Sequence, residues 1–210
     1  DASVLGLIFE KINGYKDGSF FTPGYITEYI CKKTLRRAVI DKFNKAKGWK
    51  CKDFEDLKEN IEYKQRDVRI EANEIINSLR ICDPAVGSGH FLVSALNEII
   101  AIKSELGVLQ DRQPLPKRIQ DYDIKVEYDE LVIADEDGDV FKYEPSNPSS
   151  QRIQEALFEE KRTIIENCLF GVDLNSKSVE VCRLRLWIEL LKNAYYYKTE
   201  TGERLLQTLP

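Results

Sequence analysis

The stretch "ICDPAVGSGHFLVSAL", residues 81–96, decides the fold. An apolar start gives way to an acid and a proline, then to two glycines with one residue between them, and then to apolar residues with helical spacing. This order predicts a short buried strand at about 79–82, a tight turn, and a helix over about 89–106. Glycines let a ligand approach the backbone, and the N–H groups of a helix N-terminus face that ligand. We therefore interpret the stretch as a ligand platform.

Three classes of ligand use a turn of this kind. Nucleoside triphosphates are bound by a glycine-rich loop that ends in Gly-Lys-Ser or Gly-Lys-Thr, and no such lysine follows here. Dinucleotides favour a loop with a third glycine, and Leu92 stands at that position. S-adenosylmethionine carries an ammonium, a carboxylate and a ribose but no phosphate, so an acid at the turn suits it. Asp83 can then help hold the ammonium, directly or through water, while the backbone of 86–90 wraps the methionine part.

A second acid follows the next predicted strand, in "CLFGVD" (168–173). An acid at the end of a neighbouring strand can take two ribose hydroxyls, so Asp173 is a candidate for that contact. Leu174, the next residue, could pack on the adenine face. The usual distance from the glycine turn to such an acid is about 20 residues, and here it is several times longer.

An insertion between the two strands accounts for that distance. The alternating pattern over about 124–144 predicts a β-hairpin, with Asp137-Gly138 in its turn. A helix is predicted over about 151–166. After the second strand, Asn175 can cap a last helix over about 176–197.

Helical patterns dominate the first part of the chain. Residues 2–12 are expected to form a short amphipathic helix, followed by a loop, and 53–79 are also expected to be helical. Thr22 is the expected N-cap of a further helix, with Pro23 at its first position. The chain is therefore expected to divide into an N-terminal helical subdomain, 1–78, and a second part, 79–210, that starts with the glycine turn.

Composition limits the function. The 210 residues contain 42% hydrophobic residues, enough for a buried core, and no apolar run reaches the length of a membrane span. The five cysteines form no Cys-x-x-Cys pair and His90 is the one histidine, which argues against a zinc site. A reducing cytoplasm fits this cysteine usage best. The net charge is −5, whereas a domain that binds DNA without the help of another domain is usually basic.

Several segments resemble motifs of one family, the adenine-N6 DNA methyltransferases. "DPAVGSGHFL" (83–92) is similar to its first motif, and "FTPGYITEYI" (21–30) resembles the motif that precedes it in members with this gene order. "LFGVDLNSKSVEVCRLRLWIELL" (169–191) resembles the family's second strand and following helix. Together with "LGLIFEKINGYKDGSFFTP" (5–23), they look most like the methyltransferase part of large restriction-modification proteins, where nuclease, methyltransferase and target recognition share one chain.

The resemblance implies an α/β fold with a doubly wound, Rossmann-like sheet, present here in part. It also implies S-adenosylmethionine as methyl donor and a flipped adenine as acceptor, and it places Thr22 and Pro23 near the methionine part. The candidate cofactor-binding residues are Thr22, Pro23, Asp83, Pro84, Ala85, Val86, Gly87, Ser88, Gly89, Asp173 and Leu174.

The family's catalytic motif is missing from the chain. That motif is Asn or Asp, then Pro-Pro, then Tyr or Phe, and the sequence contains no Pro-Pro. We therefore assign no catalytic residue here and expect the motif beyond Pro210. The acidic net charge likewise leads us to expect that double-stranded DNA is contacted mostly by regions outside this chain. His90 could serve as a base, but the resemblance leaves only its backbone facing the ligand.

Two other functions stay open. Related motifs serve methyltransferases that act on protein or RNA, and a module can bind the cofactor or a partner without catalysis. The fold that the resemblance implies also leaves one edge of the strand at 79–82 without its neighbour, because that neighbour follows the catalytic motif. Free strand edges recruit other strands, so we expect 1–210 alone to self-associate or to be marginally stable.

Overall fold

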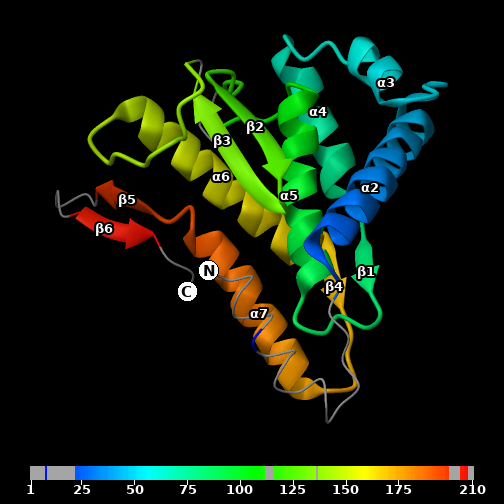
Figure 1. The fold of residues 1–210 in the computed structure, drawn as a ribbon. Coiled ribbons are helices and arrows are strands. Elements are labelled where there is room, and N and C mark those ends of the chain that lie inside the picture. Colours follow the sequence, from blue (N-terminus) through cyan, green and yellow to red (C-terminus); the bar gives the residue numbers. More distant parts are fainter. Residues whose placement is uncertain (1–7, 9–21, 112–115, 136, 199–203, 208–210) are drawn as a thin grey trace.

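A central helix, α5 (His90–Glu105), organises the molecule (Figure 1). The computed structural model describes Ile8 and residues 22–111, 116–135, 137–198 and 204–207, so the predictions for 2–12 and the following loop lie outside the described residues apart from Ile8. Every residue of α5 from Leu92 to Lys103 is buried. The helix is covered because four elements pack against it: α2 (Gly24–Lys47), the β2–β3 hairpin (Tyr122–Glu127 and Glu130–Asp135), α6 (Pro148–Asn167) and α7 (Ser176–Leu191).

Three helices precede the first strand: α2 (Gly24–Lys47), α3 (Phe54–Asn60) and α4 (Arg66–Asn77). The expected N-cap is wrong by one residue, because Pro23 occupies the N-cap position of α2 and no side chain caps it. The helix expected over 53–79 is two helices. They are separated because Ile61 adopts an extended backbone that sends its side chain into the core, where it is 3% exposed.

The prediction that both strands beside the glycine turn are buried is wrong, because Cys82, Phe170 and Gly171 are exposed. The two strands do pair in parallel. They are β1 (Ile81–Asp83) and β4 (Leu169–Gly171), with Cys82 opposite Phe170. Two backbone hydrogen bonds of 2.9 Å continue the ladder beyond them, from Val172 N to Asp83 O and from Val86 N to Val172 O. Within the described ranges, β1 has no other strand partner.

The hairpin lies earlier in the chain than its sequence pattern indicated. Its strands are β2 (Tyr122–Glu127) and β3 (Glu130–Asp135), and its turn is Tyr128-Asp129, with φ of 54° and 65°. The expected turn at Asp137-Gly138 does form, but it only folds the chain back for a single bridge between Ala134 and Val140. The chain turns at Tyr128-Asp129 although this turn lacks the usual glycine, because contacts of Asp129 with α2 and α5 hold it in place.

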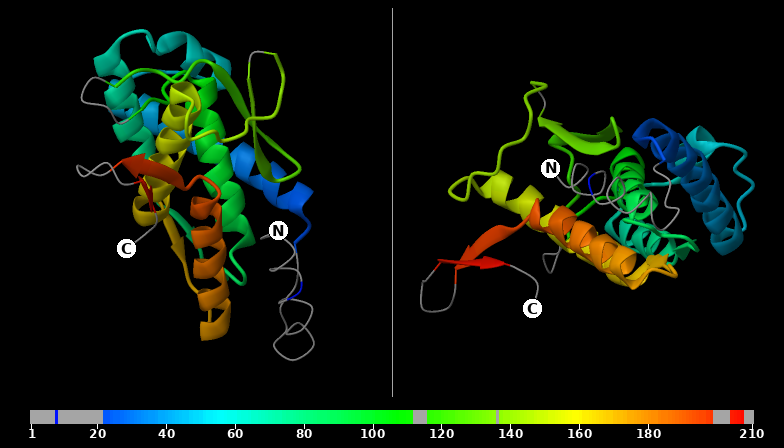
Figure 2. Two further views of the ribbon diagram at one scale, coloured as in Figure 1. Left: turned by 90° about the vertical axis from the view of Figure 1, so that its left-hand side faces the viewer. Right: turned by 60° about the horizontal axis from the view of Figure 1, so that its bottom comes forward.

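The C-terminal part contains two further helices and a second hairpin. α6 (Pro148–Asn167) starts at the Asn147 cap, and α7 (Ser176–Leu191) starts at Asn175, whose side chain accepts a 3.0 Å hydrogen bond from Lys177 N. The helix expected over 176–197 ends early, because the three tyrosines from Tyr195 start a strand. β5 (Tyr195–Lys198) pairs with β6 (Arg204–Gln207), and Figure 2 shows this hairpin apart from β2–β3.

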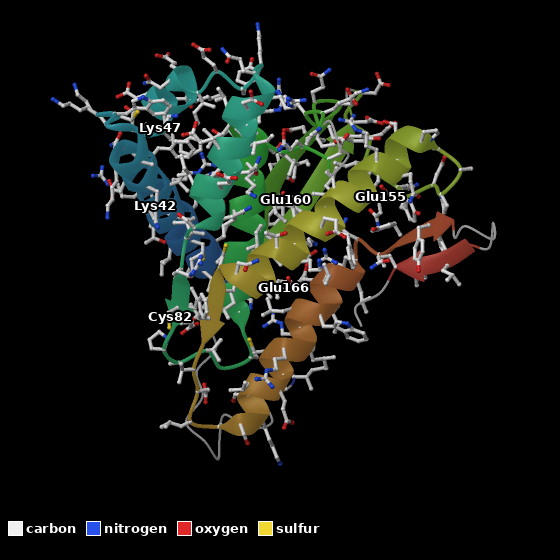
Figure 3. All side chains as sticks on the ribbon, turned by 180° about the vertical axis from the view of Figure 1, so that it is seen from behind. Lys42, Lys47, Cys82, Glu155, Glu160 and Glu166 are labelled. Atoms are coloured by element: carbon white, nitrogen blue, oxygen red, sulfur yellow. The ribbon has the colours of Figure 1, made fainter. Side chains whose placement is uncertain are left out.

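Buried lysines link the central helix to α6 and α6 to α7. Lys103 on α5 pairs with Glu160 on α6, and Lys161 on α6 donates a 2.9 Å hydrogen bond to Glu189 O on α7. Figure 3 labels Glu160 on α6 and Cys82 on β1. One hydrophobic core joins side chains from α2 to α7, and thus includes residues on both sides of position 78. No helix within the described ranges is long and apolar enough to cross a membrane.

Candidate functional site

The glycine turn connects the end of β1 to the start of α5. Gly87 and Gly89 have φ of 51° and 83°, a backbone region that other residues rarely adopt. Gly89 N donates to Val86 O at 2.8 Å, and Gly89 O receives the first hydrogen bond of α5, from Val93 N at 3.0 Å. Ser88 is 1% exposed. Both positions therefore require glycine. The rest of the turn places its backbone at the N-terminus of α5.

The two candidate acids lie at one edge of the parallel strand pair. Asp83 ends β1 and accepts a 3.0 Å hydrogen bond from Ala85 N. Asp173 follows β4, and its two carboxylate oxygens accept from Gly87 N at 2.9 Å and from Asn175 N at 2.8 Å. Asp173 therefore ties the glycine turn directly to the second strand. The structure brings the two sequence motifs together as the pattern predicted.

Both sides of the turn are tightly packed. A Cβ built on Gly89 would lie 2.6 Å from Cys182 Sγ on α7, and one built on Gly171 would lie 2.7 Å from a methyl carbon of Val86. A Cβ on Gly87 would meet nothing within 4 Å. The turn is thus in tight contact with α7 and β4. Space is left open next to Gly87, beside the Asp173 carboxylate.

Sequence reasoning missed Arg185, which supports the turn from α7. Its side chain is 2% exposed, and Nη1 donates to Ser88 Oγ at 3.1 Å and to Ser88 O at 3.3 Å. Its Nη2 lies 3.3 Å from His90 Nδ1. The signal was present in the sequence, because Cys182, Arg185, Leu186 and Glu189 recur at the spacing of a buried helical face.

The hairpin tip supports the turn from the opposite side. Asp129 Oδ2 lies 3.1 Å from His90 Nε2, and Asp129 also accepts a hydrogen bond from Ser94 Oγ. Its backbone N donates to Glu28 Oε2 on α2 at 2.9 Å. Since Arg185 is a donor only, its contact with His90 Nδ1 fits a tautomer with the proton on Nε2, facing Asp129. No local pattern in the sequence could have revealed this long-range contact.

The start of α2 lies against the same group. A Cβ on Gly24 would be 3.4 Å from Asp129 Cβ and 3.7 Å from His90 Nε2. Thr22 and Pro23, both half-buried, directly precede Gly24. The structure therefore brings the segment with Thr22 and Pro23 close to the first residue of α5.

The remaining predicted site residues differ in exposure. Pro84 and Ala85 are exposed and Val86 is buried at 4%. Leu174 is fully exposed, beside the half-buried Asp173. An apolar side chain held in the open next to an acid can cover one face of a flat ligand.

Two thiols near the turn are held in their neutral form. Burial raises the pKa of Cys182 to about 11, against the opposing effect of Arg185. Burial, followed by the charge of Asp129, raises the pKa of Cys31 to about 12. A neutral thiol is a poor nucleophile, and both cysteines are buried and pack around the turn. Within the described ranges, no three metal-binding side chains cluster.

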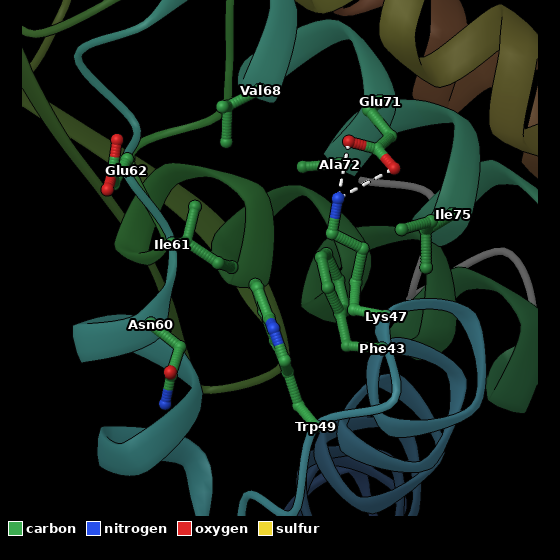
Figure 4. Close-up of a pocket in the computed structure, with 10 residues that line it drawn as sticks. All are labelled: Phe43, Lys47, Trp49, Asn60, Ile61, Glu62, Val68, Glu71, Ala72 and Ile75. Carbon is green, nitrogen blue, oxygen red and sulfur yellow. Dashed lines mark hydrogen bonds and ion pairs between the residues drawn. The ribbon is translucent and has the colours of Figure 1, made fainter.

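A cavity of about 150 Å³ lies elsewhere, between α2, α3 and α4 (Figure 4). Lys47 and Glu71 form an ion pair of 2.7 Å at its side, and Trp49 and Ile61 also line it. Trp49 stacks on Phe43 with ring centroids 6.0 Å apart. This packing assigns Trp49 to the helical core, and the cavity does not adjoin the glycine turn.

A parallel strand pair, a glycine turn between its first strand and α5, and helices packed around them define a mixed α/β domain. The family described as "MmeI, DNA-methyltransferase domain" matches residues 58–210, more than half of the chain. The chain belongs to this family of DNA-methyltransferase domains.

One curated relative extends the comparison to the whole chain. The "Putative type II restriction enzyme and methyltransferase RM.MjaORFECS2P" of Methanocaldococcus jannaschii is 33% identical over 224 residues, which cover 98% of this chain. The chain spans 15% of the length of that protein. No solved structure shows a significant match. The resemblance to the methyltransferase part of a restriction-modification protein is thus confirmed.

Proposed function

We propose that the chain holds S-adenosylmethionine for methyl transfer to N6 of a flipped adenine in DNA. The observation that carries the proposal is the placement of Asp83 and Asp173 at one edge of a parallel strand pair, on either side of a glycine turn. Ligands of doubly wound folds bind at the carboxyl ends of such strands. The cofactor supplies the activated methyl group, and the residues described above bind and orient it.

Each candidate residue has a separate part in binding. Asp83 faces the ammonium, and the backbone of 86–90 wraps the methionine part. Asp173 accepts the ribose hydroxyls, which its oxygens can do because each carboxylate oxygen has a second acceptor site besides its bond to Gly87 N or Asn175 N. The open space in front of Gly87 fits this role.

The ends of the cofactor meet the remaining candidates. Leu174 covers the adenine face, for which its full exposure suits it. Thr22 and Pro23 lie near the methionine part, a role supported by the approach of Gly24 to His90. Pro84, Ala85 and Ser88 shape the turn, with Ser88 fixed by Arg185.

The acceptor and the catalytic residues belong to the larger protein in this proposal. The sequence has no Pro-Pro, so the residues that hold the flipped adenine lie outside 1–210, and so do most contacts with double-stranded DNA. The name of the Methanocaldococcus relative supports a parent that joins a restriction enzyme to the methyltransferase. We place this parent in the cytoplasm, where its DNA is.

The proposed fold is a doubly wound sheet of which β1 and β4 are the first two strands. The β2–β3 hairpin is an insertion between them, and residues 1–78 form a helical subdomain packed on 79–210. We further propose that 1–210, produced alone, self-associates through the edge of β1 that does not face β4.

Calorimetry with S-adenosylmethionine tests the cofactor site in the protein expressed from its complete gene. Asp83→Ala and Asp173→Ala are each expected to weaken binding by about 1–3 kcal/mol, the range for losing a hydrogen bond to a charged or buried group. Asp53→Ala, which removes the N-cap of the remote helix α3, is the matched control and should leave affinity unchanged. Unaltered affinity in both site variants would contradict the assignment. Transfer of labelled methyl groups to DNA, RNA or protein then identifies the acceptor.

A further inference from the structure

A hollow lies at the C-terminal end of α5, whereas the glycine turn lies at its N-terminal end. Its volume is about 380 Å³. It is lined by five cationic side chains, Lys64, Arg69, Lys117, Arg118 and Arg152, together with uncharged residues. Because α5 has 16 residues that each rise about 1.5 Å, the two ends of the helix are about 24 Å apart. This hollow, called here the Arg118 hollow, is therefore separate from the glycine turn.

Two of its arginines hold the backbone in place. Arg69 Nη2 donates to Pro116 O at 3.1 Å. Arg152 Nη2 donates to Lys117 O at 3.1 Å and to Arg118 O at 2.8 Å, while Arg152 Nε binds Asp111. The segment that carries Lys117 and Arg118 is thus clamped by a guanidinium on each side, and its side chains start from a fixed backbone.

Arg118 itself is held by stacking. Its guanidinium lies 4.4 Å from the centroid of the Tyr63 ring. Gly107 lies against the edge of this stack, because a Cβ built on it would lie 3.0 Å from Tyr63 Cγ and 3.3 Å from Arg118 Cζ. The Arg118 side chain forms no ion pair with the described residues, and its buried Nε has no hydrogen-bond partner among them. A fixed guanidinium with unused donors is pre-organised to bind an oxyanion.

The lining of this hollow is basic, whereas a neighbouring hollow that Arg118 also borders is lined by acids, among them Glu105 and Asp121. The side-chain nitrogens of Lys64 and Lys117 have no acidic partner among the described residues, and no acid lines the Arg118 hollow. Burial lowers the pKa of Arg69, and the charges of Arg118 and Arg66 lower it further. Arg152 is paired with Asp111 and Asp121, and the other four cations still leave the lining of the hollow positive in a chain whose net charge is −5.

We propose that the Arg118 hollow binds a phosphate group, with the Arg118 guanidinium as receptor and Lys64 and Lys117 beside it. The source favoured here is a phosphodiester of the DNA backbone, a choice that rests on the proposed action on DNA. A free nucleotide offers the same chemistry. Whether the phosphate comes from DNA or from a free nucleotide, the site contributes to binding at a distance from the cofactor. A contact with phosphate does not distinguish one base from another.

The salt dependence of DNA binding tests the proposal in the protein expressed from its complete gene. The probe is a fluorescent duplex of random sequence, measured by anisotropy over a range of salt concentration. Each lost phosphate contact should reduce the slope of log K against log salt by about 0.9. Arg118→Gln and Lys117→Gln should each show such a reduction. Arg37→Gln, an equal charge change at an exposed arginine on α2 that pairs with Asp41, should not.

Separate measurements distinguish the outcomes. If duplex binding is unchanged but calorimetry shows that Arg118→Gln abolishes binding of adenosine monophosphate, the phosphate site stands and its source is a free nucleotide. If Arg118→Gln and Lys117→Gln bind both the duplex and adenosine monophosphate as Arg37→Gln does, the proposal is overturned. Because the Lys117 side chain makes no described contact, Lys117→Gln remains informative if the Arg118 variant fails to fold. S-adenosylmethionine affinity should be unchanged in all three variants, so failure of the cofactor site is detected independently.

Discussion

Gly89→Ala tests the packing of the glycine turn most directly. A Cβ at this position would lie 2.6 Å from Cys182 Sγ, 3.1 Å from its Cβ and 3.2 Å from its Cα. The residue also has a φ of 83°, which costs about 1–2 kcal/mol for a residue with a side chain. Overpacking against α7 adds about 1–3 kcal/mol. The free energy of unfolding should therefore fall by about 2–5 kcal/mol, a large part of the roughly 5–15 kcal/mol that holds a domain folded.

Two other glycines separate the steric effect from the conformational one. Gly48 and Gly87 have φ of 69° and 51°, and a Cβ on either would meet nothing within 4 Å. Gly48→Ala and Gly87→Ala should therefore lose only the conformational part, about 1–2 kcal/mol. Gly48 ends α2, so its variant also serves as a control for cofactor affinity.

Urea unfolding of the three variants provides the measurement. Cys182→Ala in the Gly89→Ala background should recover part of the loss, because it removes the contact at 2.6 Å and leaves the one at 3.1 Å. A double-mutant cycle isolates this coupling from the effect of Cys182→Ala alone. If Gly89→Ala is no less stable than Gly48→Ala, the close approach of α7 to the turn is wrong.

Three further predictions concern stability and association. Stability should fall as pH rises above about 9, because folded Cys31 and Cys182 keep protons, with pKa of about 12 and about 11, that the unfolded chain releases near 9.0. Each thiol contributes about 1.4 kcal/mol per pH unit. Lys161, whose pKa burial lowers to about 8, offsets one of them up to about 10.5, so thermal unfolding at about pH 9 and about pH 10.5 should show a net loss that Cys31→Ala removes. Tyr128→Asn should raise the unfolding free energy by about 1 kcal/mol, because Tyr128 is 94% exposed and asparagine tolerates positive φ better; a decrease in urea unfolding would contradict this. Sedimentation of 1–210 at increasing concentration should show self-association, and a stable monomer throughout would refute the open-edge argument.

The glycine turn and its two acids could be predicted from the sequence because each depends on local chemistry. A strand followed by an acid and two glycines can be recognised within a short window of sequence. The carboxyl ends of parallel strands lie at the same edge of a sheet, which brings the two acids together. The pairing of Ile81 with Leu169 and the bond from Gly87 N to Asp173 follow from that arrangement.

The errors arose where distant contacts outweighed local propensity. Asp137-Gly138 is the stronger hairpin signal, yet the hairpin turns at Tyr128-Asp129, because Asp129 reaches helices more than 30 residues away in sequence. The expected continuous helix over 53–79 failed for a related reason, since burial of Ile61 in the core outweighs the helical pattern around it. Neither effect can be seen in a sequence window.

The same contacts explain why a long insertion can stand between the glycine turn and Asp173, the two halves of the proposed cofactor site. The glycine turn is fixed by Asp173 after β4 and by Arg185 from α7, both of which follow the insertion in the chain. The insertion supplies a third support, because Asp129 at its tip holds His90, the first residue of α5. A hairpin that only lengthened the connection would leave this end of α5 with the contacts of Asp173 and Arg185 but without that of Asp129. Because the tip binds both α2 and α5, its loss would loosen the segment with Thr22 and Pro23 and the glycine turn together.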